Sequence, residues 1–301
     1  MSLAATSSDR GGPPARTVPP TSDDAEPRAR MVDVGPIRWH VATMGHGPVA
    51  LLVHGAGASS HSLLPLMRRL SRRFTVLAPD LPGHARTEIR GTFEPSLPNV
   101  AEALRGLVGA LELRPELVVG HSAGAAVLTR AILDGGLHPR LAVGLAPALV
   151  PLGGLVGAVL RPAAAILGHA TAAAFIASRF ATAVRVDRIL RGTGSALDAQ
   201  GVESYRRLIA RPEHIGGVLS MMASWDVTEL FEELSRSDVP FLLVAGRGDR
   251  AVPLAQVHDA AARLRYVTVT VVDGTGHLLH EEQPDRISRI ILDHIDRQAQ
   301  P

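Results

Sequence analysis

Short apolar runs recur along the chain from residue 37 onward, and most of them end in glycine, proline, aspartate or histidine. Some alternate apolar with polar positions, which is typical of half-buried strands, and others are continuously apolar, as in fully buried strands. The predicted strands are 37–43, 48–53, 74–78, 117–120, 141–145, 241–245 and 267–272.

Between these strands, apolar residues return every three or four positions, which indicates helices with one buried face. The predicted helices are 63–72, 97–113, 123–133, 254–264 and 284–297. Buried strands that alternate with helices at this spacing imply an α/β protein. Its sheet is expected to be mostly parallel and to carry helices on both faces.

About a hundred residues separate the strands 141–145 and 241–245, and they show no clear strand pattern. We interpret them as helices and loops inserted into the sheet domain. Residues 141–160 carry no charge, a length that would suit a membrane-spanning helix, but Pro147, Pro151 and four glycines argue against one. We expect instead a strand followed by an apolar cap over a cavity, with no transmembrane span and with peripheral membrane contact left open.

The expected domain organisation follows from these patterns. The core comprises 31–146 and 238–301, and 147–237 form the helical cap. Residues 1–30 contain five prolines and few large apolar side chains, so they cannot bury enough surface to offset the entropy lost on ordering. They also lack the apolar run of a signal peptide. We therefore expect a disordered tail on a cytoplasmic protein.

The composition removes several kinds of chemistry. All 31 positive side chains are arginine, because the chain contains no lysine, and it also contains no cysteine. This excludes a Walker lysine, a pyridoxal Schiff base, a cysteine nucleophile and cysteine-ligated metal centres. A net charge of +2 and 3% aromatic residues do not suit a nucleic-acid binder, which needs clustered positive charge.

The strongest local motif is Gly-His-Ser-Ala-Gly at 120–124, between a predicted strand and a predicted helix. This is the context that the G-x-S-x-G pattern requires. A sharp strand-to-helix turn exposes the serine hydroxyl, and larger side chains in place of the two glycines would collide. Ser122 is therefore the candidate nucleophile.

A serine nucleophile needs a base and an acid that orients the base, and here they should follow in the order Ser, Asp or Glu, His. The strand 241–245 runs into Asp249, and the strand 267–272 runs into Asp273 and His277. Functional groups of α/β sheets gather at these carboxyl ends. We assign His277 as the general base and Asp249 as its partner, with Asp273 as the alternative acid.

An oxyanion hole needs two backbone N–H donors. One is expected from Ala123, directly after the nucleophile, and the other from Ala56, in the loop that follows the strand 48–53. The small residues of that loop would let the backbone approach a substrate closely. The turn at 80–83 is read as structural, with no chemistry of its own.

The sequence leaves the role of three further side chains open. Met221, Met222 and Trp225 either line a substrate pocket or fill the core, and the pattern supports both interpretations equally.

A metal site is also considered. His277 and His280, although followed by two glutamates, do not have the H-E-x-x-H spacing of a zinc site. We therefore expect neither a metal nor a cofactor.

The motifs above resemble those of the α/β-hydrolase superfamily, over about residues 37–298. A closer resemblance is to the magnesium-chelatase accessory family of bacteriochlorophyll biosynthesis. The segments that carry the closer resemblance are 39–41, 55–62, 80–84, 120–126, 192–198, 221–226 and 276–282. That resemblance implies a role in photosynthetic pigment synthesis, with magnesium-chelatase subunits as partners and a tetrapyrrole as a ligand.

The sequence departs from the family pattern at two places. Ala85 stands where a glycine usually follows the Asp-x-Pro-Gly-His motif. The segment 145–149 carries Ala146 and Pro147 where a more polar Asn-Gly pair is expected. Neither departure touches the candidate triad.

Three functions are compatible with these residues. The first is a serine hydrolase that acts on an apolar ester or a related carbonyl compound through an acyl-enzyme. The second is a non-enzymatic accessory protein that binds a tetrapyrrole or the chelatase through the apolar cap, although binding alone would not need a triad. The third is a C–C hydrolase or cofactor-free haloperoxidase with the same triad.

Overall fold

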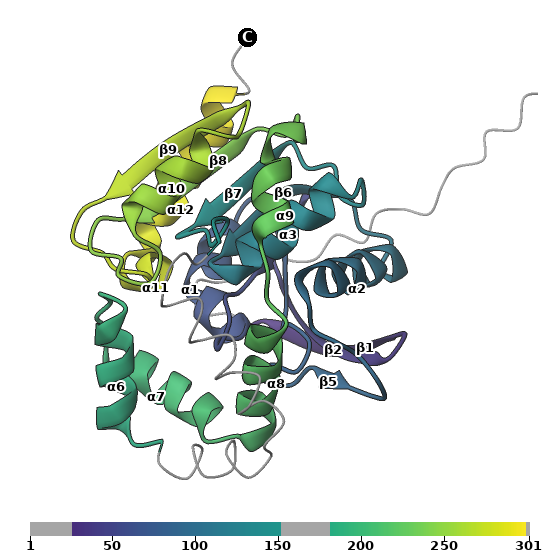
Figure 1. Ribbon diagram of the computed structural model, residues 1–301, viewed down its shortest axis with the longest axis vertical. Coiled ribbons are helices and arrows are strands. Elements are labelled where there is room, and N and C mark those ends of the chain that lie inside the picture. The colour runs from purple at the N-terminus through teal and green to yellow at the C-terminus, as the bar shows by residue number, and fades with distance from the viewer. Residues whose placement is uncertain (1–25, 152–180, 299–301) are drawn as a thin grey trace, which may run out of the picture.

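The computed structural model describes residues 26–151 and 181–298. Within them one sheet has the order β1-β2-β4-β3-β6-β7-β8-β9, with β5 paired to β2 (Figure 1). The strands are β1 Arg28–Val34, β2 Ile37–Met44, β3 Val49–Val53, β4 Thr75–Pro79, β5 Glu88–Ile89, β6 Pro115–His121, β7 Leu141–Leu145, β8 Phe241–Gly246 and β9 Val267–Val272. From β4 to β9 all neighbours are parallel, which confirms the mostly parallel α/β sheet expected from the sequence.

All seven predicted strands are present, with ends shifted by at most two residues, but the two strands β1 and β5 were missed. One is β1, whose side chains are mostly exposed and therefore show no apolar pattern. It pairs antiparallel with β2 across a turn at Gly35, where φ is +53°. The prediction of a disordered tail over 1–30 is thus wrong for residues 28–30, and 1–25 lie outside the described residues.

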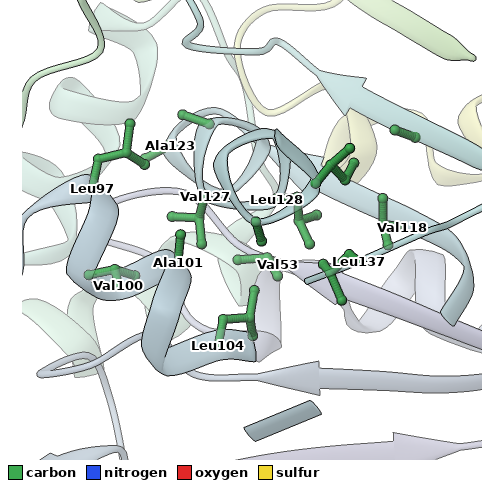
Figure 2. Packing of buried hydrophobic residues seen from close by; sticks show 14 of the residues in the cluster. Val53, Leu97, Val100, Ala101, Leu104, Val118, Ala123, Val127, Leu128 and Leu137 are labelled. Carbon is green, nitrogen blue, oxygen red and sulfur yellow. The ribbon is translucent and has the colours of Figure 1, made fainter. Parts of the chain in front are cut away.

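The alternation of side chains along the strands divides the core into two halves. On β3, Leu51 and Val53 contact one cluster, whereas Ala50 and Leu52 contact the other. The first cluster is covered by α2 (Leu97–Ala110), α3 (Ala123–Leu133) and α10 (Leu254–Ala261). Figure 2 shows part of it, where α2 and α3 meet around Val53.

The second cluster lies on the opposite face of the sheet. It is covered by α1 (Ser60–Leu70), the short α11 (Leu279–Glu282) and α12 (Pro284–Gln298). Each fully buried Leu, Val or Ile side chain contributes about 1.5–3 kcal/mol through removal of apolar surface from water. Burial on both faces explains why the inner strands are continuously apolar.

Between β7 and β8, the described residues form helices and no strand. They are α6 (Ala183–Gly192), α7 (Ala199–Ile209), α8 (Pro212–Ala223), α9 (Thr228–Glu233) and the 3-10 turn Leu234–Arg236. In Figure 1, α6, α7 and α8 lie in the lower part of the view, with α8 level with β5. A small apolar cluster, which includes Val186, Tyr205 and Leu278, joins α6 and α7 to the core.

The apolar region that follows the strand at 141–145 is only partly described. Residues 141–145 form β7, and 152–180 lie outside the described residues, so most of the apolar cap segment expected there is untested. In the described ranges no helix has both the length and the apolar character needed to cross a membrane.

Both departures from the family pattern fall where the backbone is left-handed. Ala85 has φ +47° and Ala146 has φ +44°. This region costs a residue with a Cβ roughly 1–2 kcal/mol and costs glycine almost nothing. The residue types expected from the resemblance, glycine and asparagine, are those that tolerate the conformation best.

We expect Ala85→Gly to raise the free energy of unfolding by about 1 kcal/mol, because it relieves the left-handed strain at a half-exposed site. Urea denaturation measures the change. The matched control is Ala103→Gly inside α2, which should lower stability by about 1 kcal/mol. A loss of stability in both variants would contradict the account of strain at Ala85.

Candidate active site

Ser122 occupies the sharp turn between β6 and α3. Its φ of +50° and ψ of −116° lie outside the usual regions, and its N–H donates to the Leu145 carbonyl at 3.0 Å. A Cβ on Gly120 would lie 2.4 Å from the Ala125 Cα, and one on Gly124 would lie 2.3 Å from the Val53 carbonyl oxygen. The two glycines of the motif are therefore required by close backbone contacts on either side of the serine.

His277 and Asp249 form a buried pair on the loops that follow β9 and β8. The His277 Nδ1 lies 2.8 Å from the Asp249 Oδ2. The other carboxylate oxygen accepts from the N–H groups of Ala251 and Val252 at 2.8 and 2.9 Å. A carboxylate only accepts, so the proton of the neutral imidazole is on Nδ1 and Nε2 is the free basic nitrogen.

The alternative acid, Asp273, lies elsewhere. It is exposed and makes an ion pair with Arg247, whose hydrogen bond lowers the pKa of the Asp273 carboxyl. The structure thus brings His277 together with Asp249, and Asp273 together with Arg247.

The loop after β3, residues 54–57, is fixed in place by its own first residue, the buried His54. The His54 Nδ1 donates to the Gly55 carbonyl at 2.8 Å, and its Nε2 accepts from the Leu81 N–H at 2.9 Å. Burial lowers the pKa of His54 to about 3, so the ring is neutral and the two bonds fix its tautomer. The loop is thereby fixed at the position from which Ala56 faces the cavity.

A cavity of about 330 Å³ lies above Ser122. It brings together the candidate nucleophile, both candidate oxyanion donors and all three candidate pocket residues. The lining residues are Ala56, Ser122, Ala123, Ala148, Val150, Pro151, Met221, Met222, Trp225, Asp226, Val227, Thr228, Ala251, Val252 and Gln256. Its wall is mostly apolar, and its polar side chains besides the serine are Asp226, Thr228 and Gln256.

Two placements qualify the sequence interpretation. Met221 both lines the cavity and belongs to the main core cluster, so pocket and core are not alternatives for it. His277 is not among the lining residues. Its carbonyl lies 3.1 Å from the Nε2 of His121, the residue before Ser122, which ties the loop of the candidate base to the turn of the candidate nucleophile.

His214, on α8, was not singled out in the sequence. Its Nε2 lies 3.3 Å from the Gly57 carbonyl, and its Nδ1 accepts from the Ala85 N–H at 3.1 Å. The same helix carries Met221 near its other end. One cap helix therefore contacts both the loop of the candidate oxyanion hole and the cavity. An isolated histidine in a helix carries no sequence signal for such a role.

The turn expected at 80–83 begins at Asp80, whose carboxylate is buried. It accepts from the Ser60 N–H at 2.7 Å, and its other oxygen lies 3.0 Å from the His40 Nδ1. Burial alone would raise the pKa of Asp80, but these hydrogen bonds and nearby histidines hold it at about 2. Asp80 thus fixes the start of α1 behind the 54–57 loop.

Other buried histidines surround the site. His121 contacts His277 and His280, with ring centroids 4.7 and 4.4 Å apart. Burial lowers the pKa of His280 and of His214 to about 3 and that of His61 to about 4. In residues 26–151 and 181–298, no group of three or more His, Cys, Asp or Glu side chains could hold a metal ion.

A comparison with known protein families shows to which family this fold belongs. Residues 50–290 match the model described as "Alpha/beta hydrolase family". The chain therefore belongs to the α/β-hydrolase family, as the resemblance in its motifs implied.

Among individual proteins, the chain is similar to the magnesium-chelatase 30 kDa subunit of Rhodobacter capsulatus. The two are 42% identical over 268 residues, which cover 87% of this chain and 93% of that protein. It is also 28% identical, over 84% of this chain and 96% of the relative, to the pimeloyl-[acyl-carrier protein] methyl ester esterase of Xanthomonas campestris pv. campestris.

Solved structures agree on the fold. An esterase from Thermogutta terrifontis superimposes with a TM-score of 0.71 at 21% identity, covering 90% of this chain and 98% of that one. The epoxide hydrolase CorEH gives a TM-score of 0.74 at 20% identity, covering 89% and 98% of the two chains. At these identities the likeness establishes the fold alone.

The buried histidines predict a steep loss of stability in acid. In the unfolded chain they protonate near pH 6.5, whereas in the folded protein His54, His214 and His280 do so near pH 3. Their full contribution is present above about pH 6.5. As the pH falls toward the folded-state pKa, each should cost about 1.4 kcal/mol per pH unit.

Urea denaturation between about pH 7 and pH 5 tests this prediction. The free energy of unfolding should fall several-fold more steeply than a single titrating group allows. His280→Leu should reduce the slope by about 1.4 kcal/mol per pH unit, and the exposed His138→Gln should leave it unchanged. A flat profile over this range would contradict burial of neutral histidines.

Proposed function

We propose that this chain is a serine hydrolase in which Ser122 is the nucleophile, His277 the general base and Asp249 the group that orients the base. The observation that carries the proposal is that the Ser122 cavity and the His277–Asp249 pair lie next to each other. Ser122 sits in a strained turn at a cavity that Ala56 and Ala123 also line, and the neighbouring base loop holds His277 2.8 Å from Asp249.

The mechanism follows from the roles of these groups. The Ser122 hydroxyl attacks a substrate carbonyl while the His277 Nε2 takes its proton, and the N–H groups of Ala56 and Ala123 stabilise the oxyanion. The imidazolium formed is stabilised by Asp249 and then protonates the leaving alcohol. Water, activated by the same base, hydrolyses the acyl-enzyme and releases the acid.

The cavity supports a small apolar ester or related carbonyl compound as substrate. Its walls are formed largely by alanine, valine, methionine and tryptophan side chains. A volume of about 330 Å³ is at the lower end of the ~300–1,000 Å³ found for ligand pockets. A whole tetrapyrrole would have to extend beyond the part of the cavity that the described residues enclose.

A second function is favoured by the relative from Rhodobacter capsulatus. The name of that protein describes a magnesium-chelatase subunit, and the similarity extends over most of both chains. We propose that this chain acts beside a magnesium chelatase in bacteriochlorophyll synthesis, with a tetrapyrrole as ligand or substrate. Hydrolysis and this accessory role are compatible, because Met221, Met222 and Trp225 of the cap line the same cavity as Ser122 and would contact a tetrapyrrole bound there.

Labelling with a fluorophosphonate probe tests the nucleophile. The probe should modify the wild-type chain, and Ser122→Ala should abolish labelling while circular dichroism stays unchanged. Labelling that persists in Ser122→Ala would overturn the assignment.

Hydrolysis of p-nitrophenyl esters tests the acid. Asp249→Asn should lower kcat roughly 10³–10⁴-fold, because the orienting carboxylate is lost and the imidazole takes the wrong tautomer. Asp273→Asn is the matched control and should stay within about twofold of the wild type. Greater damage from the Asp273 substitution would reverse the choice of acid.

Tryptophan fluorescence tests tetrapyrrole binding, because the two tryptophans lie in different places. Trp225 lines the cavity, whereas Trp39 is buried in β2. Protoporphyrin IX or its magnesium complex should quench the emission saturably, Trp39→Phe should keep most of the quenching, and a long-chain acyl ester should displace the porphyrin. Absence of saturable quenching would rule out direct tetrapyrrole binding and favour a hydrolase that acts on smaller apolar esters.

A further inference from the structure

A short segment of the cap, residues 193–196, contacts both loops that carry the His277–Asp249 pair. The N–H of Arg250, the residue after Asp249, donates to the Thr193 carbonyl at 3.0 Å. The N–H of Leu278, the residue after His277, donates to the Ser195 hydroxyl at 2.8 Å. One cap segment thus bonds to the chain immediately beyond the candidate acid and immediately beyond the candidate base.

Two glycines, Gly194 and Gly276, let these segments meet backbone to backbone. A Cβ on Gly194 would lie 1.9 Å from the Gly248 carbonyl oxygen, and one on Gly276 would lie 2.3 Å from the Gly194 carbonyl. Gly248 precedes Asp249 and Gly276 precedes His277. The cap segment therefore lies in van der Waals contact with both loops, without side chains between them.

Glu282 also links the cap segment to the loop that carries His277. One of its carboxylate oxygens accepts from the Ala196 N–H at 2.8 Å, and the other accepts from the Gly276 N–H at 2.7 Å. Hydrogen bonds to an ionised group are about twice as strong as neutral ones. A single carboxylate thus links the cap to the residue before His277.

These bonds hold the backbone on both sides of the imidazole. Gly276 is held by Glu282 and Leu278 by Ser195, so the backbone of His277 is fixed before and after its side chain. Ser195 is buried, with 1% of its surface exposed, so bulk solvent does not reach its hydroxyl. A displacement of this segment would move the His277 Nε2 relative to Ser122.

We propose that Ser195 and Glu282 are positioning residues for the His277–Asp249 pair, so that the cap forms part of the machinery that aligns the base. The inference rests on the proposed function, because it assigns both residues to hydrolysis at Ser122. It extends the proposed function, because the rate of hydrolysis would then depend on two residues outside the cavity that touch neither the substrate nor the reacting atoms.

The test compares Ser195→Ala and Glu282→Gln with Tyr205→Phe. The control removes another hydrogen bond between cap and core, from the Tyr205 hydroxyl to Glu281 at 2.7 Å, which involves no residue next to Asp249 or His277. Each variant is assayed with p-nitrophenyl esters across pH, for the rate of fluorophosphonate labelling and for thermal unfolding. Glu282 is half-buried, so its isosteric variant serves if Ser195→Ala does not fold.

Ser195→Ala and Glu282→Gln should each lower kcat and the labelling rate roughly 10–100-fold, with KM within about twofold and a displaced acid limb of the kcat–pH profile. Tyr205→Phe should lose stability but keep kcat and the profile. If all three variants lose stability alike and keep the wild-type kcat and pH profile, Ser195 and Glu282 only anchor the cap and the inference fails. If the wild type is not labelled at Ser122, the proposed function fails and the inference with it.

Discussion

The structure of the site depends on how closely the backbone of the β6–α3 turn can approach the end of β3. The Cβ that Gly124 lacks would lie 2.3 Å from the Val53 carbonyl oxygen, so no other residue fits there without moving the sheet or the helix. This contact sets the direction in which Ser122 leaves β6. It also places Ala123 beside the loop after β3, so the candidate nucleophile and both candidate oxyanion donors are positioned by the same packing.

The parallel sheet brings the other half of the site to the same edge. β8 and β9 are neighbours, so the loops that follow them lie side by side, and Asp249 and His277 need only short loops to meet. The pairing of Asp249 with His277 was predictable from the sequence, because it depends on which residues directly follow the two strands.

Other parts of the structure could not be predicted from the sequence, and the reasons are physical. β1 is exposed on most of its length and is held by backbone bonds to β2, so its sequence lacks the apolar pattern that reveals buried strands. His214 acts through contacts with residues more than a hundred positions earlier in the chain, and its helical neighbours give no hint of them. The roles of Ser195 and Glu282 likewise arise only when the cap docks on the core.

The contacts of α8 have a consequence for altering the substrate range of this fold. The helix contacts the Gly57 carbonyl through His214 at one end and forms the cavity wall through Met221 at the other. Between them Gly217 rests on Gly83, where an added Cβ would lie 2.0 Å from a carbonyl oxygen. The helix is therefore held at three points along its length. We expect a larger cavity at Met221 to affect more than the cavity wall, because a tilt of α8 would also displace His214 and the loop that carries Ala56, so selectivity and turnover become linked design variables.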